Sequence, residues 1–167
     1  MPTVTQPLRD EHQELLPHIE HIRTVADRVG DIPSESLRRD VDEVHGFLAH
    51  HLIPHAEAED RALYPVVARM LGAPEATATM RRDHVEIGRL TDELAGLCAQ
   101  IGEGALPVPL AKGLRRVLYG LYALVKVHFA KEEEVYLPLL DARLSPDEAR
   151  RLFENMEAAA KEAKAKH

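Results

Sequence analysis

The feature that most constrains this chain is a pattern of histidine and glutamate residues that occurs twice along its 167 residues. Each copy has one histidine, followed further along by a His-x-x-x-Glu motif. The matched pairs, offset by 72 residues in the first case and by 73 in the others, are His12/His84, His55/His128 and Glu59/Glu132. Pro65/Pro138 and Leu37/Leu110 also keep the offset of 73. A repeat of this kind predicts that one helical hairpin has been duplicated.

The composition and the helix boundary signals predict an all-α fold, because helix-forming residues dominate and glycine is sparse. Ser145, followed by Pro146 and Glu148, is a capping box that should begin the last helix. We expect one domain, residues 1–167, in which an up-down four-helix bundle (about 7–141) is followed by a C-terminal helix (about 145–165). The four bundle helices are expected at Pro7 to Val29, Ser34 to about Met70, Pro74 to about Ile101, and about Pro109 to Leu140.

The six repeated polar residues fall on apolar helix faces. The second expected helix has core positions at 37, 41, 44, 48, 51, 55, 59, 63 and 66, and the fourth at 110, 114, 117, 121, 124, 128, 132, 135 and 139. Burying four imidazoles and two carboxylates without compensation would cost on the order of several kcal/mol per group. Two divalent cations remove that cost, so the pattern predicts a metal centre with two glutamates that bridge two ions.

The other histidines call for a simpler interpretation, since a lone core histidine is usually just hydrogen-bonded. We interpret His18, His21, His45 and His50 in this way. His51 is intermediate: it lies one turn before His55, and its repeat partner is Leu124. It could be a fifth imidazole ligand or a hydrogen-bond donor to a ligand, and we expect a ligand. Pro54 should kink the helix beside it.

The whole pattern resembles the hemerythrin-like, or HHE cation-binding, family over about residues 8–140. The flanking residues are similar too: Phe47-Leu48 and Leu63-Tyr64-Pro65 surround the first motif, and Leu137-Pro138 follows the second. The resemblance implies a four-helix bundle that holds two iron ions in an oxo- or hydroxo-bridged diiron centre. The residues that match the family's ligands are His12, His55, Glu59, His84, His128 and Glu132, to which the helix pattern adds His51.

Two positions separate this chain from the oxygen-carrying hemerythrins of marine worms. Those proteins have His-x-x-x-His on the third helix, where Gly88 stands here, and an aspartate where Glu132 ends the fourth-helix motif. The chain is therefore more similar to bacterial hemerythrin-like proteins. Imidazole ligands suit iron, zinc, copper and nickel, and bridging carboxylates favour iron or manganese. The resemblance favours iron.

Net charge and local composition limit the partners. A formal net charge of −7 disfavours nucleic acid, because phosphate binding needs a basic surface. No apolar run approaches the ~18–20 residues that a membrane span needs, and the first residues lack the pattern of a signal peptide. The single cysteine, Cys98, excludes an intrachain disulfide. These features predict a cytoplasmic protein without a nucleic-acid or membrane partner, and a homodimer is compatible with them.

Two classes of function follow from such a centre. One is an oxidoreductase that reacts with hydrogen peroxide, nitric oxide or dioxygen, in a catalase-like, peroxidase-like or nitric-oxide-processing role under oxidative or nitrosative stress. The other is a non-catalytic iron or oxygen sensor that acts through a partner. Tyr64, Tyr119 and Tyr122 are candidates for proton delivery, although packing is the preferred interpretation of all three. The C-terminal helix is expected to cover apolar surface or to contact another subunit.

Overall fold

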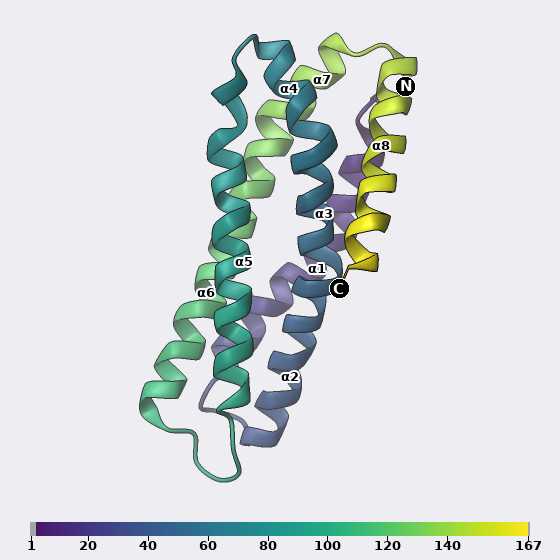
Figure 1. Cartoon of the computed structure of the whole chain (residues 1–167). Coiled ribbons are helices and arrows are strands. Elements are labelled where there is room, and N and C mark those ends of the chain that lie inside the picture. The colour runs from purple at the N-terminus through teal and green to yellow at the C-terminus, as the bar shows by residue number, and fades with distance from the viewer. Residues whose placement is uncertain (1–2, 167) are drawn as a thin grey trace.

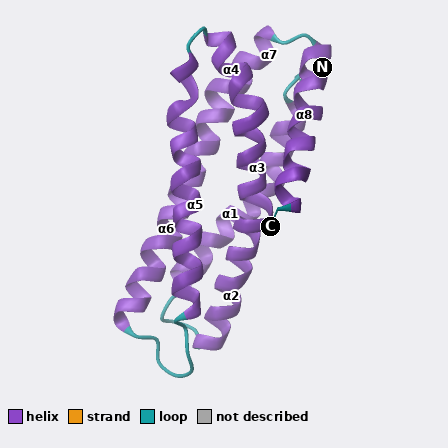
Figure 2. Ribbon diagram, in the orientation of Figure 1, coloured by secondary structure: helices purple, strands orange, loops and turns teal. Residues whose placement is uncertain are grey.

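The computed structural model describes residues 3–166, and these residues are helical throughout apart from short connections (Figures 1 and 2). Helix α1 spans Gln6–Arg28. The next helical stretch runs through α2 (Ser34–Phe47), η1 (Leu48–Leu52), α3 (Ile53–Ala58), η2 (Glu59–Leu63) and α4 (Tyr64–Leu71). The second half repeats this plan with η3 (Pro74–Thr77), α5 (Ala78–Ala99), α6 (Val108–Lys131), η4 (Glu132–Tyr136) and α7 (Leu137–Arg143). Helix α8 spans Pro146–Ala165. The predicted all-helical class is confirmed.

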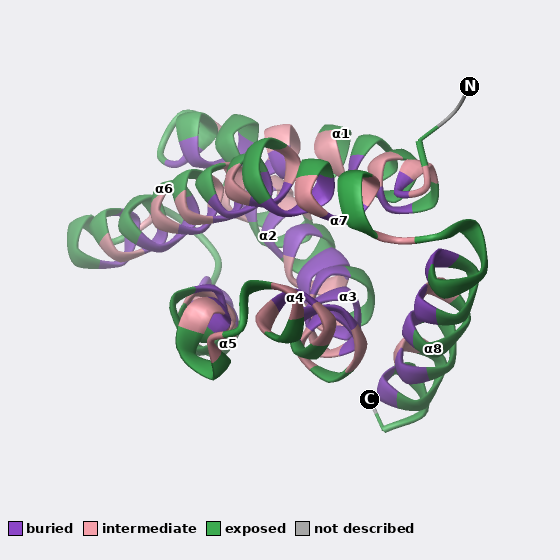
Figure 3. Cartoon of the chain, turned by 90° about the horizontal axis from the view of Figure 1, so that it is seen from above, coloured by how far each residue is buried: buried purple, intermediate pink, exposed green. Residues whose placement is uncertain are grey.

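The long helices lie side by side and share one interior. Helix α1 packs against α2 and α6, and α5 packs against the same two neighbours. Figure 3 looks down these helices and shows their buried faces turned toward one another, with α8 outside them beside α3. No helix within residues 3–166 is both long and apolar enough to cross a membrane.

The interior contains two apolar clusters with a polar layer between them. The larger cluster contains Ile19 of α1, Leu52 of η1, Ile87 of α5 and Val125 of α6. The smaller cluster contains Leu8, Ala58, Met80 and Tyr136, together with residues of α8. Each long helical stretch therefore crosses from one cluster to the other through its predicted histidine or glutamate. The six repeated polar residues occupy this crossing.

Three five-residue π-helical segments interrupt the long stretches, and each ends next to a proline. The amide of Ile53, Tyr64 or Leu137, which immediately precedes the proline, donates to the carbonyl five residues back. A proline has no N–H, and its ring clashes with the carbonyl four residues earlier, so a wider turn relieves the conflict. Two of these segments begin at Glu59 and Glu132.

Each π-helical segment shifts the apolar face by about one residue, because a π turn holds more residues than an α turn. The predicted core positions 51 and 135 are therefore wrong, and position 66 is only partly buried. Leu52 is buried where His51 was expected, and Val67 is buried where Val66 was expected. Val135 is 58% exposed, whereas its neighbour Tyr136 is buried.

The helix ends are close to those predicted. The capping box of α8 is confirmed: the Glu148 backbone N–H donates to the Ser145 side chain, and the Glu148 carboxylate accepts from the Ser145 backbone N–H. Helix α2 begins at Ser34, as expected, and Pro33 occupies its N-cap position. The Ser34 hydroxyl donates to the carbonyl of Gly104, at 2.6 Å, and so joins two loops at the far end of the molecule.

Candidate metal centre

The structure brings all six repeated residues together inside the polar layer. His12 comes from α1, His55 from α3, His84 from α5 and His128 from α6, and the two glutamates are the first residues of η2 and η4. Glu59 and Glu132 have no exposed surface, and the histidines are almost fully enclosed. Helices from both copies of the repeat thus contribute side chains to a single site.

The six side chains form two half-sites that share the glutamates. In the first half-site, His55 Nε2 lies 2.8 Å from Glu59 Oε1, and His12 Nε2 lies 3.3 Å from Glu132 Oε2. In the second, His84 Nε2 lies 3.3 Å from Glu59 Oε2, and His128 Nε2 lies 3.4 Å from Glu132 Oε1. Each carboxylate therefore offers one oxygen to each half-site, as a bridging carboxylate would.

The distances between these nitrogen and oxygen atoms are close to those expected for two ligand atoms that bind the same ion. Two ligand atoms that each lie ~2.1 Å from one ion, at right angles, are ~3.0 Å apart. One set of atoms that could hold an ion belongs to His12, His55, Glu59 and Glu132, and a second set belongs to Glu59, His84 and His128.

An outer ring of four carboxylates orients the imidazoles. His55 Nδ1 lies 2.9 Å from Glu11, and His128 Nδ1 lies 2.9 Å from Asp83. Two further contacts cross between the repeats, from His84 to Asp60 at 2.9 Å and from His12 to Glu133 at 2.7 Å. A proton held on Nδ1 by a carboxylate leaves the Nε2 lone pair free for a metal.

Sequence reasoning missed this outer ring, although the repeat contains the signal for it. Glu11 and Asp83 each precede the first histidine of their repeat, and Asp60 and Glu133 each follow the buried glutamate of the His-x-x-x-Glu motif. The outer carboxylates are thus duplicated with the same register as the inner residues. Arg9 holds Glu133 in place through an ion pair of 2.6 Å.

Tyr64 belongs to the second half-site. Its hydroxyl donates to Glu132 Oε1 at 2.6 Å and lies 3.2 Å from His128 Nε2 and 3.4 Å from His84 Nε2. The other two tyrosines considered from the sequence lie elsewhere: Tyr119 bonds to Asp27, and Tyr122 to Glu20.

The electrostatics of the cluster favour ionised glutamates with positive charge between them. Burial lowers the pKa of His12 and of His128, but the Glu132 and Glu59 carboxylates outweigh it and raise these values to about 9 and about 10. Burial raises the pKa of Glu59, yet the surrounding imidazoles, His55 first, hold it well below its usual range. Burial, and then the Glu59 and Glu132 carboxylates, raise the pKa of the Tyr64 hydroxyl. Positive charge at the centre of the cluster stabilises both carboxylates.

The donor set also leaves buried atoms that need a partner. His12 Nε2, His55 Nε2, both oxygens of Glu59 and Glu132 Oε2 are buried without a hydrogen bond in the described part of the chain. In the second half-site His84 Nε2 and His128 Nε2 face each other at 2.9 Å, where two lone pairs would repel without a cation or a proton between them. The residues therefore fit a pair of metal ions held by imidazole nitrogen and carboxylate oxygen.

His51 lies outside this cluster. It is exposed, and its ring stacks on Phe47 with the ring centroids 6.3 Å apart. The π-helical segment Leu48–Leu52 turns it off the face that carries His55, so its position differs from the expected one. Of the four histidines interpreted as ordinary residues, His50 and His18 are exposed and His18 stacks on Phe47, while His21 and His45 are partly buried.

Comparison with known proteins agrees with the site. The family model described as the hemerythrin HHE cation binding domain matches residues 3–140. The chain belongs to this family of hemerythrin-like cation-binding domains. Neither a curated protein nor a solved structure matches it. Helix α8 lies beyond the matched residues.

Proposed function

We propose that this protein holds two iron ions in an up-down four-helix bundle and reacts there with a small oxidant. The observation that carries the proposal is the pair of buried glutamates, each of which has one oxygen in each half-site. His12 and His55 would bind one ion, and His84 and His128 the other, while Glu59 and Glu132 would bridge the two. The family match supports a cation at this place, and bridging carboxylates with imidazole favour iron.

When bound, such a pair of ions supplies an electrophilic site with accessible redox states for hydrogen peroxide, nitric oxide or dioxygen. The chain's own residues supply orientation and exclusion of water. Four Nδ1–carboxylate contacts fix the imidazole planes, and the apolar clusters on either side keep the polar layer dry.

Tyr64 is the residue placed to hold a proton at the site. Its hydroxyl hydrogen points at Glu132 Oε1, and its raised pKa keeps that hydrogen in place at neutral pH. Because the hydroxyl lies beside His84 and His128, it could donate to an oxygen atom of a small molecule bound in the second half-site. Tyr64 thus favours chemistry in which oxygen accepts a proton, as in peroxide reduction.

Iron loading followed by turnover measurements tests the proposal. The protein should bind two iron ions per chain, develop a visible absorption spectrum, and consume peroxide or nitric oxide for many cycles. Zinc-loaded protein is the matched control, because zinc fills imidazole and carboxylate sites without redox change. Two bound irons with no turnover of either molecule would favour the sensor alternative and contradict an enzymatic role.

A further inference from the structure

The outer carboxylate Glu133 is held by an arginine that is itself anchored on two sides. Arg9 of α1 contacts Glu133 at 2.6 Å and Asp141 of α7 at 3.1 Å. Its Nε–H donates to the hydroxyl oxygen of Thr5 at 3.2 Å, and Thr5 donates to Asp141 from its backbone N–H and its hydroxyl. Because Glu133 contacts His12 Nδ1 at 2.7 Å, this network fixes the imidazole of one predicted ligand of the first half-site.

The second copy of the repeat contains the same arginine without the same anchor. Arg81 corresponds to Arg9 at the offset of 72 residues, but Ala68 corresponds to Asp141 at the offset of 73. The Arg81 guanidinium lies over the ring of Tyr64 instead, 5.8 Å from the ring centroid. Among the described residues, the second half-site therefore has no counterpart of an arginine held between two carboxylates.

The two half-sites also differ in the number of donors that they bring together. In the first, ligand atoms of four residues lie close enough to hold one ion, and in the second, ligand atoms of three residues do so. The remaining candidate in the second half-site, Glu132 Oε1, already accepts the hydrogen bond from the Tyr64 hydroxyl at 2.6 Å. An ion in the second half-site must compete with this hydrogen bond for the oxygen.

The buried atoms of the first half-site have the greater need of a cation. His12 Nε2, His55 Nε2 and Glu132 Oε2 are buried without a hydrogen bond in the part of the chain that the structure describes. In the second half-site, His84 Nε2 and His128 Nε2 lie within hydrogen-bonding distance of each other, at 2.9 Å. A cation therefore satisfies more unpartnered polar atoms in the first half-site than in the second.

We propose that the half-sites fill in order, that the first holds its ion more tightly, and that Arg9 is a positioning residue for this tighter site. The inference rests on the proposed function, since it takes the cluster to hold two ions. Arg9 acts through Glu133 on His12 and does not itself bind the ion. An imidazole that is already fixed loses less freedom when an ion binds, so the clamp favours binding in one half-site. The second half-site is then the one that releases its ion first.

Calorimetric titration of the metal-free, full-length protein with Zn²⁺ tests the order, because zinc binds imidazole and carboxylate without redox change. Wild-type protein should bind two ions in two steps, with Kd values about tenfold or more apart, the size of effect that partners of metal ligands have. Arg9→Gln should weaken the tighter step by about tenfold, so that the two steps merge. Arg81→Gln is the matched control, because the same change at the equivalent position should leave the tighter step unchanged.

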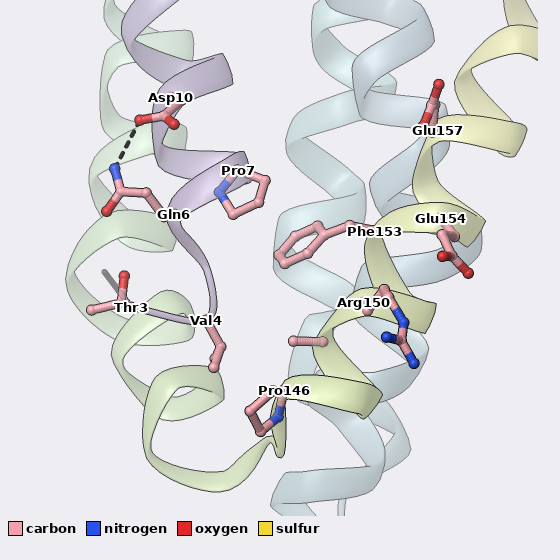
Figure 4. Close-up of a pocket in the computed structure, with 11 residues that line it drawn as sticks. Thr3, Val4, Gln6, Pro7, Asp10, Pro146, Arg150, Phe153, Glu154 and Glu157 are labelled. Atoms are coloured by element: carbon pink, nitrogen blue, oxygen red, sulfur yellow. Dashed lines mark hydrogen bonds between the residues drawn. The ribbon is translucent and has the colours of Figure 1, made fainter. Parts of the chain in front are cut away.

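A second control separates positioning from loss of charge. Arg150 is exposed on α8 beside a surface cavity, which Figure 4 shows between this helix and the N-terminal residues, and it pairs with Asp147 at 3.0 Å. Arg150→Gln removes the same charge outside the cluster and should change neither step. If Arg9→Gln only lowered the melting temperature of metal-free protein and left the ratio of the two Kd values unchanged, Arg9 would have no positioning role.

Three further results would overturn the order: equal Kd values in wild-type protein, an Arg9→Gln variant that weakens only the weaker step, or equal weakening of the tighter step by Arg9→Gln and Arg81→Gln. If Arg9→Gln does not fold, Arg9→Lys decides. A lysine cannot reproduce the planar fork that contacts two carboxylates, so the tighter step alone should weaken, by a smaller factor. The proposed function fails separately, when iron-loaded wild-type protein with two bound ions turns over neither peroxide nor nitric oxide.

Discussion

The two half-sites have matching ligands but different surroundings. In the first, the His12 ring stacks on Phe129 with the ring centroids 4.3 Å apart, and a cavity reaches His55. In the second, the hydroxyl of Tyr64 lies among His84, His128 and Glu132. The two copies of the repeat therefore share the clustered histidines and glutamates and differ in the residues around them.

Aligning the two copies of the repeat shows which residues differ between the surroundings of the two half-sites. Tyr64 corresponds to Leu137 and Phe129 to Ala56, at the same offset of 73 residues. The first half-site therefore has the apolar ring of Phe129 beside it, and the second has the hydroxyl of Tyr64. If two ions are bound as proposed, this asymmetry would place a proton donor beside one ion only, although each ion would have two histidine ligands.

The largest effect is expected where the half-sites share a residue. Glu59→Ala or Glu132→Ala removes one oxygen from each half-site, so either change should reduce bound iron from two ions per chain to one or none. His50→Ala is the control, because His50 is exposed outside the cluster and should leave the count at two. Iron analysis of purified protein checks this. A count near two in both glutamate variants would show that the assignment of bridging residues is wrong.

Removing the metal should destabilise both half-sites alike, because it leaves their buried polar groups without a cation. Metal at about 1,000 times its Kd stabilises a folded protein by ~4 kcal/mol. For a chain of this size, metal-free protein should then melt about 10 °C lower. Calorimetry with and without iron measures the difference. Equal melting temperatures would contradict coupling between metal binding and folding.

The outer carboxylates should act on one half-site each. Asp60→Asn loosens His84 in the second half-site, and Glu133→Gln loosens His12 in the first. Each change should weaken metal binding by about 10–100-fold, with the loss confined to one of the two ions in a metal titration. Asp10→Asn is the control, because Asp10 is exposed and its carboxylate accepts a hydrogen bond from Gln6, outside the cluster. Identical titrations for all three variants would refute a role for these contacts.

Tyr64→Phe should alter the second half-site alone. The lost hydrogen bond should lower stability by about 1 kcal/mol, and peroxide turnover should fall because the site loses its proton donor. Tyr136→Phe is a close control, since that hydroxyl donates to the carbonyl of Ala76 and is not in contact with the cluster. It should cost similar stability and leave turnover intact. Equal turnover in both variants would contradict proton donation by Tyr64 and indicate that it serves only in packing.

The smallest effect is expected at His51. Because this side chain is exposed and stacks on Phe47, His51→Leu should leave the iron count, the visible spectrum and peroxide turnover unchanged. The sequence alone favours the opposite result, a lost ligand in one half-site. A changed spectrum in this variant would restore His51 as a ligand and make the two half-sites unequal in their ligands as well.

The contrast between His55 and His51 shows which residues of the candidate site could be predicted from the sequence. The repeat identified His55 because its partner His128 stands at the equivalent place, and no assumption about helix geometry was needed. His51 was placed by helical periodicity alone, and the periodicity fails across the π-helical segment. The same failure misplaced Val135. It also left Tyr64 as one of three candidate tyrosines, because Tyr64 follows Glu59 by five residues, one more than the four of an α-helical turn.

The wide turns at Glu59 and Glu132 have a consequence for protein design. A His-x-x-x-Glu motif grafted onto an uninterrupted α-helix would reproduce the ligands but rotate every later residue by ~100° for the one position that the wide turn absorbs. Tyr64 and the apolar residues after it would then face another neighbour. The smallest portable unit of this centre therefore extends from the histidine through the proline, His55 to Pro65 and His128 to Pro138.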